Sequence, residues 1–146
     1  MDEFIKLLDE NLDYLEHKII DDTIIIYVAS NRKEVTCPYC GKKSFRVHST
    51  YDRSFQDLPI QGKKVKVIID NRKIFCDNRE CSHTTFAETF DFLPPKAKKS
   101  QRLTDEIINI SLNVSSITAS DLLKNGIADV GKSTICNLLK KRYTKY

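Results

Sequence analysis

Five cysteines are the residues of this 146-residue chain best suited to chemistry. Four of them form close pairs, because two residues separate Cys37 from Cys40 and four separate Cys76 from Cys81. Thiolates two residues apart can enter one tetrahedral metal site when the backbone turns tightly, and Gly41 favours that turn. Four sulfur ligands leave no coordination position for water. The spacing therefore predicts a structural zinc site, held by Cys37, Cys40, Cys76 and Cys81.

The alternatives to this zinc site are four reduced cysteines in a small core, or a redox-active pair. An odd number of cysteines without a secretory signal argues against a disulfide framework. His83 lies two residues after Cys81 and is the rival fourth ligand. Cys81 is favoured because it keeps the two pairs symmetrical. Cys136 falls within an apolar helical pattern and is interpreted as a small buried hydrophobic residue.

The segments around the cysteine pairs predict mostly β-structure. Residues 4–15 place a phenylalanine and four leucines at helical spacing, which predicts a short amphipathic helix. The β-branched run 23–29 predicts a strand. Further strands are expected over 45–49 and 65–69, and Asp70-Asn71 is interpreted as a turn that leads back to the second cysteine pair. These elements together predict a zinc ribbon of β-hairpins.

The C-terminal third is predicted to be helical. Residues 93–100 contain two consecutive prolines and three lysines, which predicts a solvated linker. Helices are expected over 103–112, 118–124 and 133–142. We therefore predict an α+β protein with the following organisation: an N-terminal helix and strand over 1–30, a zinc-ribbon domain over 31–92, a linker over 93–100 and a helix-turn-helix over 101–146.

Residues 126–133, GIADVGKS, match the phosphate-binding loop pattern letter for letter. That loop requires a buried strand before it, whereas residues 120–125 read as helix. We therefore expect no nucleotide, and interpret the segment as the turn of a helix-turn-helix. An ordinary three-helix bundle is the alternative. The side chains predicted to contact the DNA groove lie near the start of the last helix: Lys132, Ser133, Thr134 and Asn137.

Charge is unevenly distributed along the chain. Residues 1–30 hold two basic and eight acidic side chains, whereas residues 31–102 hold sixteen basic and eight acidic ones. A basic region of this kind points to a polyanionic partner such as double-stranded DNA. The predicted phosphate contacts are Arg46, Arg53, Lys63, Lys64, Lys66, Arg72 and Lys73.

The sequence also gives expectations for localisation and assembly. It lacks the apolar run of about 20 residues that spans a bilayer, and its N-terminus is acidic where a secretory signal is basic. We therefore expect a cytoplasmic protein with no membrane partner. We also expect that the chain can form a homo-oligomer.

Several stretches resemble a known family. The segment CPYCGKKSFRVHSTYDRSFQDLPIQGKKV, followed by RKIFCDNREC and TFAETF, resembles the N-terminal zinc-binding segment of the ISL-three insertion-sequence transposases. The likeness covers residues 37 to about 90, and the helices beyond it resemble the helix-turn-helix of the family more loosely.

The resemblance implies recognition of the terminal inverted repeats of a mobile element during DNA transposition, a form of DNA recombination. It places cutting and joining in a downstream RNase-H-like domain that this chain lacks, so we expect no enzyme here. One rival is a zinc-ribbon module for protein interaction or regulation. The other is a nuclease, for which Asp52, Asp57, Asp70 and Asp77 are too scattered in the sequence to nominate a carboxylate set.

Overall fold

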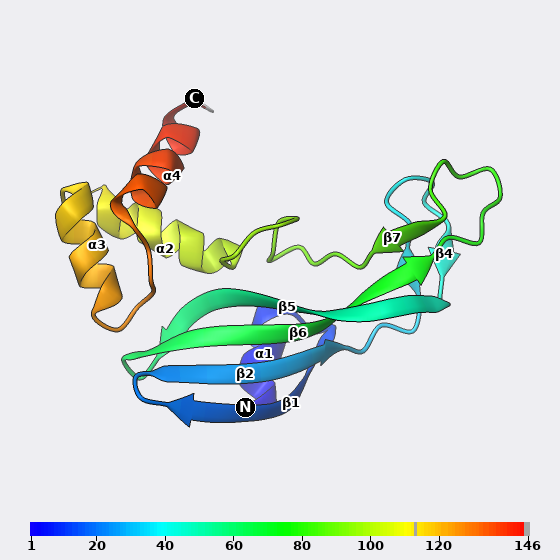
Figure 1. Ribbon diagram of the computed structural model, residues 1–146, viewed down its shortest axis with the longest axis horizontal. Coiled ribbons are helices and arrows are strands. Elements are labelled where there is room, and N and C mark those ends of the chain that lie inside the picture. Colours follow the sequence, from blue (N-terminus) through cyan, green and yellow to red (C-terminus); the bar gives the residue numbers. More distant parts are fainter. Residues whose placement is uncertain (113, 145–146) are drawn as a thin grey trace.

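A five-stranded sheet forms the centre of the computed structural model, which describes residues 1–112 and 114–144 (Figure 1). Residues 113, 145 and 146 belong to the predicted helix-turn-helix but lie outside the described residues. β2 and β6 are parallel neighbours, and the other neighbouring strands are antiparallel. The order of the strands is β1 (Leu12–Ile20), β2 (Thr23–Ser30), β6 (Lys63–Phe75) and β5 (Val47–Ile60), with β7 (Thr85–Ala87) paired to β6.

The hairpin of β5 and β6 is the longest element, with strands of 14 and 13 residues. Its turn lies at Gln61 and Gly62, whose φ angles of 50° and 74° suit a two-residue hairpin loop. The turn predicted at Asp70-Asn71 is wrong, because β6 runs straight through both residues. Asn71 is buried there, and its amide donates a hydrogen bond of 2.8 Å to the hydroxyl of Tyr51. A residue that commonly forms turns is thus tolerated inside a strand because its side chain has a partner.

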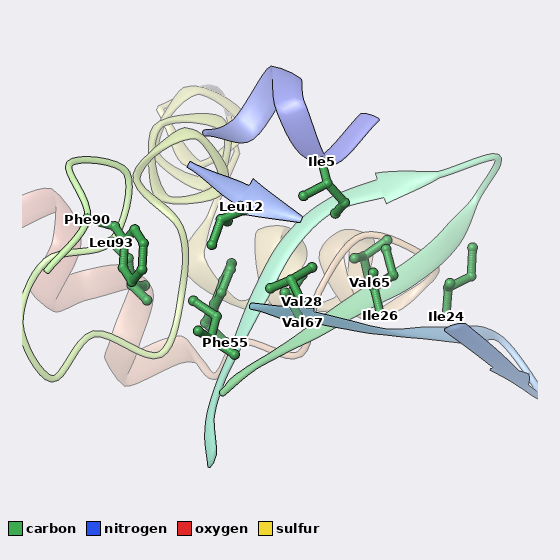
Figure 2. Close-up of a cluster of buried hydrophobic side chains, with 11 residues drawn as sticks. Ile5, Leu12, Ile24, Ile26, Val28, Phe55, Val65, Val67, Phe90 and Leu93 are labelled. Carbon is green, nitrogen blue, oxygen red and sulfur yellow. The ribbon is translucent and has the colours of Figure 1, made fainter. Parts of the chain in front are cut away.

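One face of the sheet is apolar and is covered by helix α1 (Asp2–Leu8), through the buried side chain of Ile5. Figure 2 shows these side chains pointing toward one another from the strands, from α1 and from the segment that follows β7. They alternate with more exposed residues along β2 and β6, as a sheet with one buried face requires. The cluster consists of Ile5, Leu12, Ile24, Ile26, Val28, Phe55, Val65, Val67, Ile69, Phe90 and Leu93.

The helix predicted over residues 4–15 is too long. α1 ends at Leu8, and β1 begins at Leu12. Between them Asp9 is extended, and its carboxylate accepts a hydrogen bond of 2.7 Å from the N–H of Asn11, which forms a local turn. Leu12 is then fully buried, whereas Leu15 is 57% exposed. The leucine spacing suggested one continuous helix, but the acidic turn divides the segment into a helix and a strand.

Residues 93–100 were expected to form a solvated linker, but they lie along the edge of β5. The N–H of Gln56 donates to the carbonyl of Lys98, and the N–H of Ser100 donates to the carbonyl of Gln56, both at 2.9 Å. Leu93 and Ser100 are buried. The prolines remove backbone donors only at their own positions, so their neighbours can still pair with the strand. The predicted boundary at position 30 does not separate two units either. β2 pairs with β6, so residues on both sides of that position share one core.

The three predicted C-terminal helices are confirmed as α2 (Gln101–Ser111), α3 (Ser116–Lys124) and α4 (Lys132–Thr144). Ser100 and Ser115 cap the first two, because their hydroxyl oxygens accept backbone hydrogen bonds from Leu103 and Thr118. No helix among the described residues is both long and apolar enough to cross a membrane. The helices enclose a second core of Leu103, Ile107, Ala119, Leu123, Ala128, Val130 and Ile135.

A polar joint holds this helical unit against the hairpin. Asp57 on β5 is buried, and it accepts hydrogen bonds from the hydroxyl of Ser100 at 2.7 Å and from Arg102 Nε at 2.8 Å. The hydrogen bond to this carboxylate raises the pKa of the Arg102 guanidinium. Nearby, the side-chain amide of Gln56 bonds both the N–H and the carbonyl of Asp129. The loop before α4 is therefore fixed to the sheet.

Gly126 lies in the same joint and gives a test of it. A Cβ atom at this position would lie 2.8 Å from the carbonyl oxygen of Gly62, and the φ of +116° is unfavourable for any L-residue. We expect Gly126→Ala to lower the free energy of unfolding by about 1–3 kcal/mol. The measurement is denaturant unfolding followed by circular dichroism.

The matched control is Gly131→Ala, since a Cβ atom added there would meet no atom within 4 Å and the φ of this glycine is not positive. This change should leave stability within about 0.5 kcal/mol of the original chain. Equal losses in the two variants would contradict the contact between the loop and the hairpin turn.

Candidate metal centre and nucleic-acid interface

The first cysteine pair is presented by a small hairpin of β3 (Val35–Thr36) and β4 (Lys43–Ser44). The N–H of Cys37 donates to the carbonyl of Lys42, and the N–H of Gly41 donates to the carbonyl of Cys37, both at 2.9 Å. Gly41 has a φ of 79°, as the tight turn predicted from the sequence requires. The backbone therefore closes around this pair.

The second pair lies in the loop between β6 and β7. Cys76 directly follows β6, and its N–H donates to the carbonyl of Thr84 at 2.9 Å. The N–H of Cys81 donates to the carbonyl of Asn78 at 3.0 Å, and the side chain of Asn78 accepts from the N–H of Glu80. These turns point both thiols toward the first pair.

The four cysteine sulfurs lie within 4.8 Å of one another. The sulfur atoms of Cys37 and Cys81 are 3.9 Å apart, and those of Cys40 and Cys76 are 3.6 Å apart. A tetrahedral site with Zn–S bonds of about 2.3 Å has sulfur–sulfur edges of about 3.8 Å. The cluster thus suits zinc, and it is the only group of three or more potential metal ligands among the described residues.

Thiols of the cluster shift one another's pKa values. A hydrogen bond from the backbone at Lys42 is the main cause that lowers the pKa of Cys40 to about 6. At Cys76 a backbone hydrogen bond at Asn78 opposes the shift, but burial and the neighbouring thiols raise the pKa to about 12. A second negative charge beside the first thiolate is therefore unfavourable. A divalent cation removes this repulsion and stabilises all four sulfurs as thiolates.

Neither of the other residues considered for this site belongs to it. The ring of His83 stacks on Tyr39 with 3.5 Å between ring centroids, and its Nδ1 bonds the hydroxyl of Ser82. The fourth sulfur of the cluster comes from Cys81, as predicted. Cys136 lies on α4, outside the cluster.

Arg72, predicted to contact phosphate, is a structural residue. Its Nε and Nη2 atoms each lie 2.9 Å from a carboxylate oxygen of Glu88, whose side chain is fully buried. Nη2 also donates to the Ser30 hydroxyl and to the carbonyl of Arg32. These bonds join β2, β6 and the segment after β7 beside the zinc ribbon. Nothing in the sequence pattern pointed to Glu88.

The other predicted phosphate contacts are spread along β5 and β6, with Arg46 directly before β5. Arg53 donates to the carbonyls of residues 94 and 97, and Lys64 pairs with Asp129 at 2.9 Å. Lys63 reaches the carbonyl of residue 21 at 3.4 Å. Arg46 pairs with residue 77 at 2.7 Å and lies over the ring of residue 75. Lys66 and Lys73 are exposed.

The carboxylates considered for a nuclease do not converge. Asp52 and Asp70 lie opposite one another on β5 and β6. Asp57 is held by Arg102, and Asp77 is paired with Arg46.

The residues predicted to contact the DNA groove lie on the first two turns of α4. Lys132, Ser133 and Asn137 are exposed, and Thr134 is partly buried. Residues 126–133, which match the phosphate-binding loop, comprise most of the connection between α3 and α4 and the first two residues of α4, so a helix and not a strand precedes the loop. The buried hydroxyl of Ser120 donates to the carbonyl of Val130 at 2.7 Å and fixes the approach to α4.

Comparison with known proteins identifies the central part of the chain. Residues 33–81 match the family model described as the zinc-finger of transposase IS204/IS1001/IS1096/IS1165. Searches among curated proteins and among solved structures gave no match. The matched segment contains all four clustered cysteines. The resemblance found in the sequence is thus confirmed for residues 33–81, which form a zinc-ribbon region of the transposase type.

The zinc cluster leads to a prediction about metal removal. We expect one zinc ion per chain, with an affinity that falls as the pH is lowered, because protons compete with the metal for the thiols. Structural zinc contributes on the order of 10–16 kcal/mol in zinc-finger peptides, so chelation should unfold the ribbon. Metal analysis and near-ultraviolet circular dichroism measure the two effects.

Three variants separate the roles of the candidate ligands. Cys76→Ser should abolish stoichiometric zinc binding, whereas Cys136→Ser and His83→Ala should preserve it. A chain that keeps its full melting transition after chelation would contradict a structural site. Loss of zinc in His83→Ala would show that the ligand set is wrong.

Proposed function

We propose that this chain is the DNA-recognition part of an insertion-sequence transposase and that it binds the terminal inverted repeats of a mobile element. The observation that carries the proposal is the match of residues 33–81 to a transposase zinc finger, together with the four-cysteine cluster in that segment. In this proposal the chain is not itself an enzyme. A separate catalytic domain cuts and joins the DNA.

The helical unit supports this proposal as the reader of base sequence. α3 and α4 are joined by residues 125–131, a connection longer than the usual turn of a helix-turn-helix. Ala128 and Val130 are buried and anchor that connection in the helical core. The start of α4 then exposes Lys132 and Asn137, side chains that can reach phosphates and base edges in a major groove.

The zinc ribbon and the segment along β5 supply cations for phosphate contacts. Lys42, Lys43 and Arg79 are exposed on the ribbon, and Lys96 and Lys98 are exposed on the segment between the ribbon and the helices. These contacts would position the duplex without reading its sequence.

The length of the hairpin sets the spacing of the two DNA contacts. Figure 1 shows the helical unit and the zinc ribbon at opposite ends of β5 and β6. Thirteen residues at roughly 3.3 Å each separate these ends by about 40 Å. One turn of B-DNA is about 34–36 Å long. The two contacts would therefore lie on the same face of a duplex, roughly one helical turn apart.

The test is binding of the zinc-loaded chain to duplexes that it selects from a randomised pool. Affinity should fall with salt, with a log–log slope of about −0.9 for each neutralised phosphate. Lys132→Ala should weaken binding to every duplex. It should also make the slope shallower by about 0.9, the contribution of one phosphate contact. Asn137→Ala should reduce the difference in binding free energy between selected and random DNA by about 1–3 kcal/mol. Hydroxyl-radical footprinting should show two protected patches about one turn apart.

A matched control removes a lysine from the far side of the molecule. Lys6 lies on α1 and pairs with Asp13, so Lys6→Ala should leave DNA binding unchanged. If the chain ignores DNA at low salt, the proposed function is wrong.

A protein-interaction or regulatory module is the second candidate. Phe45 and Tyr39 on the ribbon are 72% and 55% exposed, and aromatic residues are enriched in protein interfaces. Phe45→Ala would then impair capture of a partner protein and leave DNA binding untouched.

A further inference from the structure

The sheet has a second face, opposite α1, on which charge is arranged in rows. Figure 1 views the sheet from this face, with α1 behind it and the three C-terminal helices beside β5. Residues paired across strands project from the same face. The register therefore gives one row with Lys18, Ile25, Lys66 and Gln56, a second with Glu16, Tyr27, Ile68 and Ser54, and a third with Asp13, Ala29, Asp70 and Asp52.

These rows form a gradient of charge across an apolar centre. The first row carries two lysines, and its Gln56 holds the loop before α4. The third row carries three aspartates, of which Asp13 is already paired with Lys6 of α1 at 2.6 Å. Tyr27 and Ile68 lie between them next to Ile25 of the first row, and all three are only partly buried, whereas Glu16 of the middle row is exposed. Lys18 already covers part of this centre, with its ammonium 5.5 Å from the ring centroid of Tyr27.

Electrostatic repulsion within the aspartate row is unfavourable in the single chain. Asp52 and Asp70 are directly opposite on neighbouring strands and both are exposed. Like charges in this arrangement repel one another. Among the described residues neither carboxylate forms an ion pair, and Lys66 forms none either. Cations supplied by another molecule would relieve the repulsion.

We infer that this face binds a second copy of the chain across a two-fold axis. An axis that lies along the middle row and perpendicular to the strands reverses the strand direction of the partner. It therefore places the lysine row of one chain over the aspartate row of the other, with the two middle rows in contact. Lys66 then faces Asp70 of the second copy, and Asp70 faces its Lys66. A face with lysines at one end and aspartates at the other is complementary to itself in this orientation, in which the exposed Glu16 of the middle row is the one charge that meets its own copy.

The area of the face agrees with a weak dimer. Four strands about 4.8 Å apart, with some eight residues of about 3.3 Å each, cover on the order of 500 Å². Two such faces bury about 1,000 Å², the lower limit of a specific interface. The dimer should therefore form at micromolar concentrations and dissociate as salt screens the charge pairs.

The experiment is sedimentation velocity of the full zinc-loaded chain over a range of concentrations, without DNA. We expect a dimer at low salt. Lys66→Asp and Asp70→Lys should each weaken association at least about tenfold, because each places like charges across the axis. The double variant Lys66→Asp/Asp70→Lys should restore association, because the swap recreates both pairs. Zinc content and far-ultraviolet circular dichroism report whether each variant is folded.

Lys73→Asp is the control, since it makes the same charge change on an exposed residue of β6 outside these rows. It should leave association unchanged. A chain that stays monomeric at low salt, a double variant that associates as poorly as the single ones, or an equal effect of Lys73→Asp would each overturn the inference. None of these outcomes depends on whether the chain binds DNA.

Discussion

The hydrogen-bonded ladder between β5 and β6 is the constraint on which the rest of the structure depends. Cys76 directly follows β6, so the end of the hairpin sets the position of the zinc ribbon. The turn of the hairpin contacts the loop before α4 at Gly126, so the other end sets the position of the helices. β2 adds to the same hairpin through parallel pairing. A two-strand element of this length is stable only because β2, α1 and the core complete it.

Two buried carboxylates fix the helical unit and the zinc ribbon to the two ends of this hairpin. Asp57 holds Arg102 at the start of α2, and Glu88 holds Arg72 next to the ribbon. Loss of one partner of a buried ion pair costs about 3–5 kcal/mol, although the intact pair adds little net stability compared with apolar residues. The pairs are therefore best understood as devices that fix orientation. Fixed orientation is what a protein needs if two separate surfaces are to contact one duplex in register.

The sequence predicted the features that depend on local spacing and missed those that depend on distant partners. The cysteine pairs, the strand over 23–29 and the three C-terminal helices are confirmed, because neighbouring residues determine them. Arg72 was predicted to contact phosphate because it lies in the basic region, and its actual partner, Glu88, lies 16 residues away, where no local pattern links the two. The passage of β6 through Asn71 and the pairing of residues 93–100 with β5 likewise depend on tertiary contacts. The local propensities of the residues do not predict such contacts.

The charge on the sheet also bears on where DNA can lie. A duplex laid over the open face would meet the repulsive carboxylates of Asp52 and Asp70 two rows away from the lysine row. If the chain binds DNA as proposed, the β5 edge, with the exposed Lys96 and Lys98, would be the better path between the ribbon and α4. Lys66, which the sequence analysis predicted to contact phosphate, lies on this same face, two rows away from Asp70. A two-fold dimer through the open face would then carry two DNA-binding edges in opposite orientations. That symmetry matches two copies of a sequence arranged as inverted repeats.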